Sequence, residues 1–509
     1  MRCVMVNSTN PGIARVAWIT ALLTFVIHLV ANPHYGFFRD ELYFIICGFH
    51  PAWGYVDQPP IVPLLAAGSQ LFGHSLLLLR AVAALFAAGC VYVTCFLVAE
   101  LGGSVFAALT ASLLVFFSPV LMNFGMKVST DMPGLVLWPL IALFVLRLVR
   151  GADSRLWLVV GALLGLSLES KYSVIFFAVA LVFALLILPQ RKALFSPWFL
   201  AGAGLAFLIV LPNALWQMHY DWPMWQLLQA GQHGKNVIAG PLLYIIQEFL
   251  ITNILFAPLL IAGIIVLLRH RDARFLGLGY LVLIALMILF HGKHYYPANI
   301  YPIVFAGSGI ALAAWTNRLL WLRPLALAFI IIAGTIFTPF SLPILSEAGI
   351  SAYTAAISSA LHIGKTLATE HGKTVRLEQD YADMHGWRSL AHTVEAVYAQ
   401  LPAAQQKEAV IAASNYGEAS AIVFFGHNLP PVISGHNNFW IWGTHGVSGN
   451  VVIDVNGDCG HGKLFASQRL LTRFSNPWGV ADEDNIPIML CTGIKTPIQT
   501  LWPRVKKFI

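Results

Sequence analysis

The stretch Arg39-Asp40-Glu41-Leu42-Tyr43 follows the first membrane-length apolar segment of this chain, and Gly54-Tyr55-Val56-Asp57-Gln58-Pro59-Pro60 follows soon after it. Three carboxylates thus stand near the expected end of a membrane span, where charge is costly unless it is solvated or used. A solvated loop is one explanation for them. The interleaved Tyr, Trp and Pro residues instead favour a structured loop packed on the membrane surface.

Composition sets the class of protein. Hydrophobic residues make up 58% of the chain and charged residues 10%, against roughly 25% charged in soluble domains. We therefore expect a polytopic α-helical membrane protein in a lipid bilayer, with about eleven transmembrane helices. The net charge of +7 does not indicate nucleic-acid binding, because the basic residues lie in short loops. The expected spans are 13–33, 77–99, 104–122, 132–149, 156–169, 172–188, 198–215, 242–267, 274–290, 299–315 and 322–341.

The loop charges predict the orientation. One set of loops holds most of the Arg and Lys residues, and the set that carries the acidic stretches holds fewer. By the positive-inside rule, the N-terminus is expected in the cytoplasm and the acidic stretches outside it. The first span lacks a small-residue cleavage site and is expected to remain as an anchor.

The composition changes near residue 345. The last 165 residues hold 13 of the 23 Asp and Glu residues and no membrane-length apolar run. We expect a transmembrane domain at 1–344 and an extracytoplasmic soluble α/β domain at 345–509. Its predicted strands are 410–413 and 451–453, and its predicted helices are 386–401 and 415–425.

The cysteines fall into two groups. Cys90 and Cys95 lie in an expected span and are interpreted as small apolar residues. Cys459 and Cys491 lie in the expected external domain, where an oxidising compartment permits a disulfide bond. The bond requires Cα atoms within about 7 Å of each other.

The acidic residues at the external span ends suggest proton transfer. Asp40, Glu41, Asp57 and Asp131 all fall there, and a positioned carboxylate can take a proton from an acceptor hydroxyl. Asp131 has a structural alternative, because Asp is also favoured as the N-cap of a helix that begins near Pro133.

The external cations suggest a phosphate site. Lys171 lies at the break between two half-length spans, and Lys293-His294-Tyr295-Tyr296 opens the tenth span. Both are expected to face a leaving phosphate. The alternatives are a Lys171 side chain that extends toward the membrane surface and a His294 that packs in the aromatic belt.

A metal ion is the other ligand considered. His219, His233 and Asp57 are candidate ligands for a divalent metal, although no ligand spacing supports such a site. No other cofactor is expected.

Several of these stretches carry a family resemblance. Asp40-Glu41, Gly54–Pro60, Thr130-Asp131-Met132-Pro133 and the Lys171 turn together resemble the protein-O-mannosyltransferase-like branch of the GT-C glycosyltransferases. Bacterial members of that branch include the aminoarabinose lipid A transferases and the core galacturonosyltransferases. The C-terminal stretches Ser414–Ala419 and Gly435–Asn438 resemble the periplasmic domains of bacterial members. The resemblance implies a GT-C-like catalytic domain at 1–344 and a bacterial inner-membrane location.

The resemblance also implies a reaction. A sugar on a polyprenyl phosphate donor is transferred to a hydroxyl of a lipid, lipopolysaccharide or other cell-envelope acceptor, usually with inversion. Asp40 matches the catalytic base, with Glu41 as its neighbouring alternative and Asp131 as a further catalytic position. Tyr55, Asp57, Gln58, Lys171, Lys293, His294 and Tyr295 are the expected substrate-binding residues. Gln58 departs from the aminoarabinose transferases, which have Lys before the Pro-Pro pair. The phosphate charge would then fall to Lys171 or Lys293.

Two other functions fit parts of the sequence. A transporter or flippase for a lipid-linked or small polar substrate would place ionisable groups near the bilayer midplane, within broken helices. The middle of each expected span is almost uncharged, although Glu169 and Lys171 lie at a helix break. A binding or assembly scaffold would explain the C-terminal domain but not the acidic stretches.

Overall fold

The computed structural model describes residues 10–234, 240–361, 376–460 and 462–509. The chain forms two compact units. The helical unit comprises Met1–Pro33, Leu77–Leu215 and Val237–Ile344, and the mixed unit comprises His34–Leu76, Trp216–Asn236 and Leu345–Ile509. Both acidic stretches therefore fold with the C-terminal region. The domain boundary at 344/345 stays a prediction, and the mixed unit takes in two segments from the N-terminal side of it.

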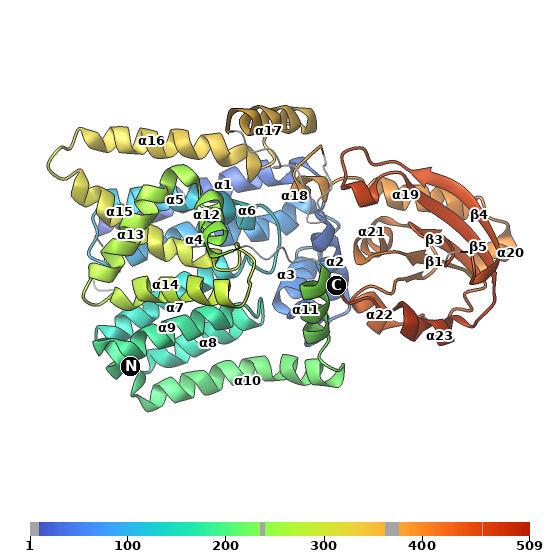
Figure 1. Cartoon of the computed structure of the whole chain (residues 1–509), viewed down its shortest axis with the longest axis horizontal. Helices are drawn as coiled ribbons and strands as arrows, with labels where there is room; N and C mark the ends of the chain where they lie inside the picture. Colours follow the sequence, from blue (N-terminus) through green and yellow to red (C-terminus); the bar gives the residue numbers. More distant parts are fainter. Residues whose placement is uncertain (1–9, 235–239, 362–375, 461) are drawn as a thin grey trace. The chain divides into compact units, whose positions relative to one another are not determined.

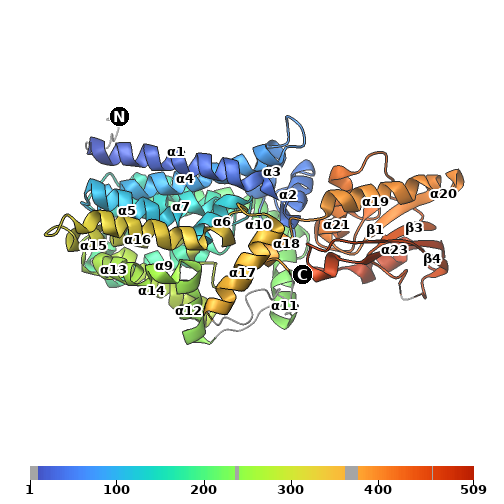
Figure 2. The same ribbon diagram turned by 90° about the horizontal axis from the view of Figure 1, so that it is seen from above.

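Apolar helices dominate the helical unit and share one large core of buried Leu, Val, Ala and aromatic side chains. Most of them run roughly along one direction (Figure 2). The shared core follows from the sequence, because helices that are apolar all round can be buried or face lipid on any side. The helices are α1 (Pro11–Ala31), α4 (Leu76–Glu100), α5 (Val105–Phe116), α6 (Pro119–Met126), α7 (Gly134–Val149), α8 (Leu156–Leu168), α9 (Val174–Ile187), α10 (Pro197–His219), α12 (Pro241–Ile251), α13 (Ala257–Arg269), α14 (Arg274–Leu289), α15 (Tyr301–Trp315) and α16 (Leu322–Phe337).

Each expected span lies on one of these helices or on a bent pair of them. Within the described residues, five helices are long and apolar enough to cross a membrane, or up to seven if each bent pair is one span. The four remaining helices, α7, α8, α9 and α14, are apolar but only 10–17 residues long. The structure thus supports a multi-pass helical protein and leaves the number eleven a prediction.

Two expected spans are not straight. The α5–α6 pair bends by 65° and the α12–α13 pair by 97°. The first bend stands before Pro119, which cannot continue the hydrogen-bond pattern of the preceding turn. At the second, Asn253 adopts a φ of 86°; its side chain accepts a hydrogen bond from the backbone N–H of Leu255 and donates one to the carbonyl of Ala333.

The mixed unit contains a five-stranded sheet in the order β2-β1-β3-β5-β4 (orange to red in Figure 1). β1 pairs in parallel with β2 and β3, whereas β5 pairs antiparallel with β3 and β4. The strands are β1 (Ala409–Ala413), β2 (Val432–Ile433), β3 (Val451–Val455), β4 (Phe465–Phe474) and β5 (Ile486–Ile494). The two predicted strands are confirmed as β1 and β3. The sequence missed β4 because most of its residues are exposed on an edge strand and lack a buried apolar pattern.

The helices of the mixed unit come from all three of its segments. The predicted helices at 386–401 and 415–425 are confirmed as α19 and α21, and α2 packs against α21. The helices are α2 (Arg39–Phe49), α3 (Ile61–Gly68), α11 (Pro223–Gly234), α17 (Glu347–Leu361), α18 (Gln379–Ala382), α19 (Trp387–Ala399), α20 (Ala403–Glu408), α21 (Tyr416–Phe425), α22 (Asn438–Trp442) and α23 (Ile498–Leu501).

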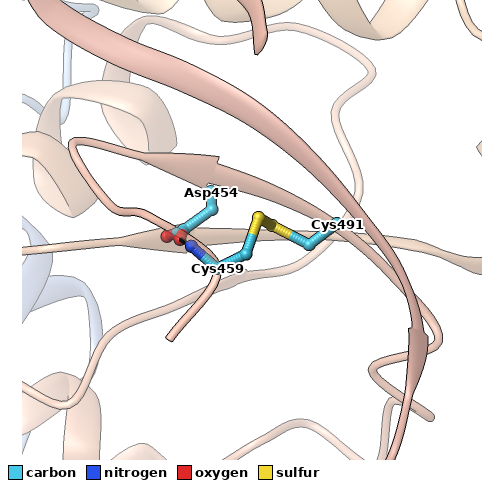
Figure 3. The surroundings of a disulfide bond; sticks show 3 residues. All are labelled: Asp454, Cys459 and Cys491. Carbon is cyan, nitrogen blue, oxygen red and sulfur yellow. Dashed lines mark hydrogen bonds between the residues drawn. A yellow bond between two sulfur atoms is a disulfide. The ribbon is translucent and has the colours of Figure 1, made fainter. Parts of the chain in front are cut away.

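Cys459 and Cys491 form the disulfide bond that the sequence permitted (Figure 3). Their Cα atoms lie 5.8 Å apart. The bond fastens the turn after β3 to β5, and the backbone N–H of Cys459 donates to the Asp454 carboxylate over 2.9 Å. Cys90 and Cys95 are buried and free, as expected for small apolar residues.

Candidate active site

The first acidic stretch begins helix α2, and its two carboxylates have different surroundings. Glu41 accepts a hydrogen bond from the backbone N–H of Phe38 over 2.9 Å, which closes the first turn as the N3 residue of a capping box does. Its side chain is fully buried. Asp40 keeps 35% of its side chain exposed. Of the two neighbours, only Asp40 is open to a ligand from solvent.

Asp40 contacts a neighbouring residue of α2 and a residue of the C-terminal segment. The Tyr416 hydroxyl donates to Asp40 Oδ1 over 2.7 Å. The Arg39 guanidinium lies 3.7 Å from the same oxygen and 3.5 Å from the Asp383 carboxylate. Asp40 Oδ1 is thus held by a hydroxyl donor and lies beside a cation.

Asp57 lies in the loop between α2 and α3 and has a different electrostatic setting. The Tyr43 hydroxyl lies 3.1 Å from Asp57 Oδ1, and the Asn437 amide donates to Asp57 Oδ2 over 3.3 Å. Burial, and after it the charge of Asp40, raises the pKa of Asp57 to about 7. Asn438 fixes the loop by accepting from the backbone N–H of Val56 over 2.8 Å.

The two neighbours of Asp57 in the sequence prediction lie in the interior. Tyr55 is fully buried, and its hydroxyl donates to the carbonyl of Cys47 over 2.8 Å. Gln58 is 1% exposed, and both polar atoms of its amide lack a hydrogen-bond partner. Tyr55 thus ties the loop to α2, and a substrate-binding role for either residue stays a prediction.

The second cluster belongs to the helical unit and centres on an ion pair. Lys171 Nζ lies 2.6 Å from Asp131 Oδ2. The same ammonium stands over the rings of Tyr295 and Tyr296, 5.1 Å and 4.5 Å from their centroids. Lys171 is therefore paired and not a lone charge, and its position relative to the membrane surface stays a prediction.

Asp131 is not a helix cap. The N-cap position of α7 is Pro133, and no side-chain cap is formed there. Instead the Asn299 amide donates to the carbonyl of Asp131 over 3.1 Å. Gly134 permits this approach, because a Cβ atom at that position would lie 2.1 Å from the Asn299 amide nitrogen. The capping alternative for Asp131 is wrong.

A small cavity with room for about one water molecule adjoins the ion pair. Its polar lining consists of Thr130, Ser167, Ser170, Lys171, Ser173 and Asn299. Near it, Asp131 Oδ1 and Asn299 Oδ1 are buried without a hydrogen-bond partner. Unpaired buried acceptors are costly, so a ligand that brings hydroxyl donors would be favoured here.

The remaining predicted cation segment also lies in the helical unit. Lys293 Nζ stands 5.9 Å from the centroid of the Tyr295 ring, and the ring of His294 packs edge-on against Tyr295. Burial, and after it the charge of Lys293, lowers the pKa of His294. This packing agrees with the aromatic alternative for His294.

Among the described residues, no group with metal-ligand spacing contains His219 or Asp57. Within the described residues, the one group with metal-ligand spacing is Asp454, Cys459 and Cys491, and it does not include His219 or Asp57. Its two sulfurs are joined in the disulfide bond (Figure 3), so neither is available as the thiolate that binds metals. The side chain of His233 lies outside the described part of the chain.

Asp40, Asp57 and the residues that contact them or the loop of Asp57 form an acidic cluster. Four residues of this cluster had no predicted role. Tyr43 lies in the first acidic stretch, and Tyr416, Asn437 and Asn438 belong to the two C-terminal motifs. The only sequence signal for the last three residues was the composition of those motifs, which combine Asn and Tyr with Gly in a short stretch. Nothing in the sequence indicated that they would meet Asp40 and Asp57.

The apolar helices of the helical unit are typical of a multi-pass membrane protein. The sequence model of the family described as dolichyl-phosphate-mannose-protein mannosyltransferase matches residues 57–216. No curated protein sequence matches the chain. The matched segment and the fold described below confirm the resemblance to the protein-O-mannosyltransferase-like GT-C family.

Two crystal structures of ArnT from Cupriavidus metallidurans share the fold. The structure bound to undecaprenyl phosphate aligns with a TM-score of 0.61 and 12% identity, over 93% of this chain and 97% of ArnT. The apo structure aligns with a TM-score of 0.58 and 13% identity, over 95% and 98%. The chain is a glycosyltransferase-like membrane protein.

The Asp131–Lys171 pair generates a stability prediction. Asp131→Asn leaves the Lys171 ammonium without its counter-charge, and losing one partner of a buried pair costs about 3 kcal/mol or more. The Asp131→Asn/Lys171→Met double variant removes both charges. We expect thermal unfolding of the purified protein to show a large loss in the single variant and a smaller one in the double variant. Equal stability of Asp131→Asn and the unchanged protein would contradict the pairing.

The pKa of Asp57 generates a pH prediction. Because this pKa is raised to about 7 in the folded state from 3.8, the folded state binds the proton more tightly than the unfolded state. Stability is then present at low pH and falls as pH rises from about 4 to about 7, by at most about 1.4 kcal/mol per pH unit. Asp57→Asn lacks this titration. The difference in melting temperature between the two proteins should shift in favour of the Asn variant across that range, and a difference independent of pH would refute the raised pKa.

Proposed function

We propose that this protein is an integral-membrane glycosyltransferase that moves a sugar from a polyprenyl phosphate donor to a hydroxyl of a lipid, lipopolysaccharide or other cell-envelope acceptor, with inversion. The shared fold with ArnT, which was crystallised with undecaprenyl phosphate, supports the donor class. The family match over residues 57–216 supports glycosyl transfer from a lipid phosphate.

The observation that carries the proposal is the pair of unlike carboxyls in the mixed unit. Asp40 is partly exposed and bound by a hydroxyl donor and a guanidinium. Asp57 holds its proton up to a pKa of about 7, in part because Asp40 is charged. Two nearby carboxyls in unlike surroundings are typical of acid–base sites. Asp40 is then the base that takes the proton of the acceptor hydroxyl.

Asp40 is favoured over Glu41 as that base. The Glu41 carboxylate accepts a hydrogen bond from the backbone N–H of Phe38, and its side chain is fully buried. A general base must come within about 3 Å of the proton it removes. Asp40 meets this requirement because a third of its side chain faces solvent.

The helical unit offers the groups for the donor. Lys171 and Lys293 supply positive charge for a phosphate, and the hydroxyls of the adjoining pocket supply neutral donors. The unpaired oxygens of Asp131 and Asn299 suit sugar hydroxyls. Gln58 brings no charge, so the leaving phosphate depends on the two lysines. Asp131 neutralises part of the Lys171 charge, which leaves Lys293 as the cation with the greater share.

The proposal includes a location. The N-terminus lies in the cytoplasm of a bacterium, the chain spans the inner membrane, and residues 345–509 lie in the periplasm. The loop charges motivate this orientation. The disulfide bond between Cys459 and Cys491 supports an oxidising compartment for the C-terminal region.

Asp40→Asn tests the mechanism. The amide keeps the size and polarity of the carboxyl but cannot accept a proton. Turnover should fall by about 10²–10⁴-fold, with donor binding unchanged. Asp458→Asn, an exposed aspartate of the same unit, is the matched control and should be fully active.

The alternatives to Asp40 have distinct results. If Asp40→Asn turns over normally and Glu41→Gln is inactive, the base lies one residue along. If both variants turn over normally, the proposed mechanism fails.

A further inference from the structure

The motif Ser414-Asn415-Tyr416-Gly417-Glu418 contributes the hydroxyl that binds the proposed base. Its Tyr416 lies 376 positions from Asp40 in the chain and donates to Asp40 Oδ1 over 2.7 Å. We infer that Tyr416 is a positioning residue for Asp40 and that the rest of the motif is the support that holds its hydroxyl in place. This inference rests on the proposed function.

The support begins with a capping box. Asn415 accepts from the backbone N–H groups of Gly417 and Glu418 over 2.8 and 3.0 Å. Glu418 in return accepts from the backbone N–H groups of Ser414 and Asn415 over 2.8 and 3.3 Å. Such reciprocal bonds satisfy the free N–H groups at the start of a helix. Tyr416 is the first residue of α21, so its backbone is fixed between the two halves of the box.

Two buried carboxyl groups, those of Glu418 and Glu483, hydrogen-bond with the capping box and its surroundings. Glu418 is fully buried and Glu483 is 4% exposed. Asn456 donates to Glu418 over 2.7 Å, and the Asn415 side chain donates to Glu483 over 2.8 Å. Burial raises the pKa of both Glu418 and Glu483. The raised pKa values favour the neutral form, which avoids two adjacent buried charges.

Gly417 allows the two helices to meet. A Cβ atom at this position would lie 2.5 Å from Cγ of Arg39, so any other residue would displace the Arg39 side chain or separate α21 from α2. Because Arg39 passes here, its guanidinium stands 5.6 Å from the centroid of the Tyr416 ring. The same side chain pairs with Asp40 and Asp383. Gly417 therefore leaves room for the Arg39 side chain that reaches Asp40.

The chemistry of the contact follows from its direction. A hydroxyl that donates to a carboxylate favours the charged form and fixes the orientation of the oxygen that it binds. Both effects prepare Asp40 to accept a proton from a hydroxyl held at a defined angle. The competing role is packing, since the Tyr416 ring also lies 4.7 Å from the Tyr43 ring and 4.8 Å from the His436 ring.

Tyr416→Phe separates these two roles. The variant keeps every ring contact and loses only the hydroxyl. Because hydrogen bonds to charged groups are among the stronger ones, we expect turnover to fall by about 10–100-fold with the donor KM unchanged. The acid limb of the rate–pH profile should also move to higher pH, since Asp40 then holds a proton more tightly. The control is Tyr398→Phe in α19, whose hydroxyl binds the carbonyl of Gln406; it should change neither quantity.

A second measurement does not depend on turnover. Carbodiimide labels protonated carboxyls, and peptide mass spectrometry of the full-length protein gives the pH at which Asp40 is half labelled. This midpoint should rise in Tyr416→Phe and stay constant in Tyr398→Phe. An unchanged labelling midpoint in Tyr416→Phe would overturn the positioning role, whatever its turnover. If the unaltered protein consumes no donor but the labelling midpoint still shifts in Tyr416→Phe, the proposed function is wrong. The contact between Tyr416 and Asp40 would then still be supported.

Discussion

The guanidinium of Arg39 and the hydroxyl of Tyr416 together join helix α2 to the C-terminal part of the mixed unit. Both reach Asp40, and Arg39 also reaches Asp383. Removing charged groups from water is expensive, and the cost is met only when each charge finds a counter-charge and hydrogen bonds. The arrangement of the acidic cluster depends on this contact, because Asp40 and Asp57 come from one end of the chain and Tyr416, Asn437 and Asn438 from the other.

The mixed unit is unusual in how many buried carboxyls it tolerates. Asp57, Glu418, Glu483 and Asp454 all have pKa values raised by burial. Burying a neutral acid costs less free energy than burying a carboxylate. The raised pKa values therefore make these buried positions tolerable in the folded unit. Asp40 differs from them through its exposure and its two charge-stabilising partners. That contrast, more than the number of carboxylates, makes it the group suited to accept a proton.

Much of the helical unit was predictable, because apolar stretches of the right length form helices whatever their partners are. Asp40 and Asp57 were identifiable for a similar reason, since carboxylates are conspicuous in so apolar a chain. The bends at Ser118 and Asn253 were missed, because a span that is apolar throughout carries no sign of a change in direction. The burial of Gln58 and the partners of Asp40 depend on contacts between distant segments. The Asp131–Lys171 bond does so as well, and local patterns say nothing about such pairings.

The central claim is that the chain consumes a lipid-linked sugar, and the most direct measurement follows that sugar. Purified protein in liposomes would be given polyprenyl phosphate carrying a labelled sugar, together with extracted cell-envelope acceptors, and the free polyprenyl phosphate and the anomeric configuration of the product would be measured. The account predicts stoichiometric release of polyprenyl phosphate and a product inverted at the anomeric carbon. Movement of intact donor across the membrane without release would contradict it and point to a transporter.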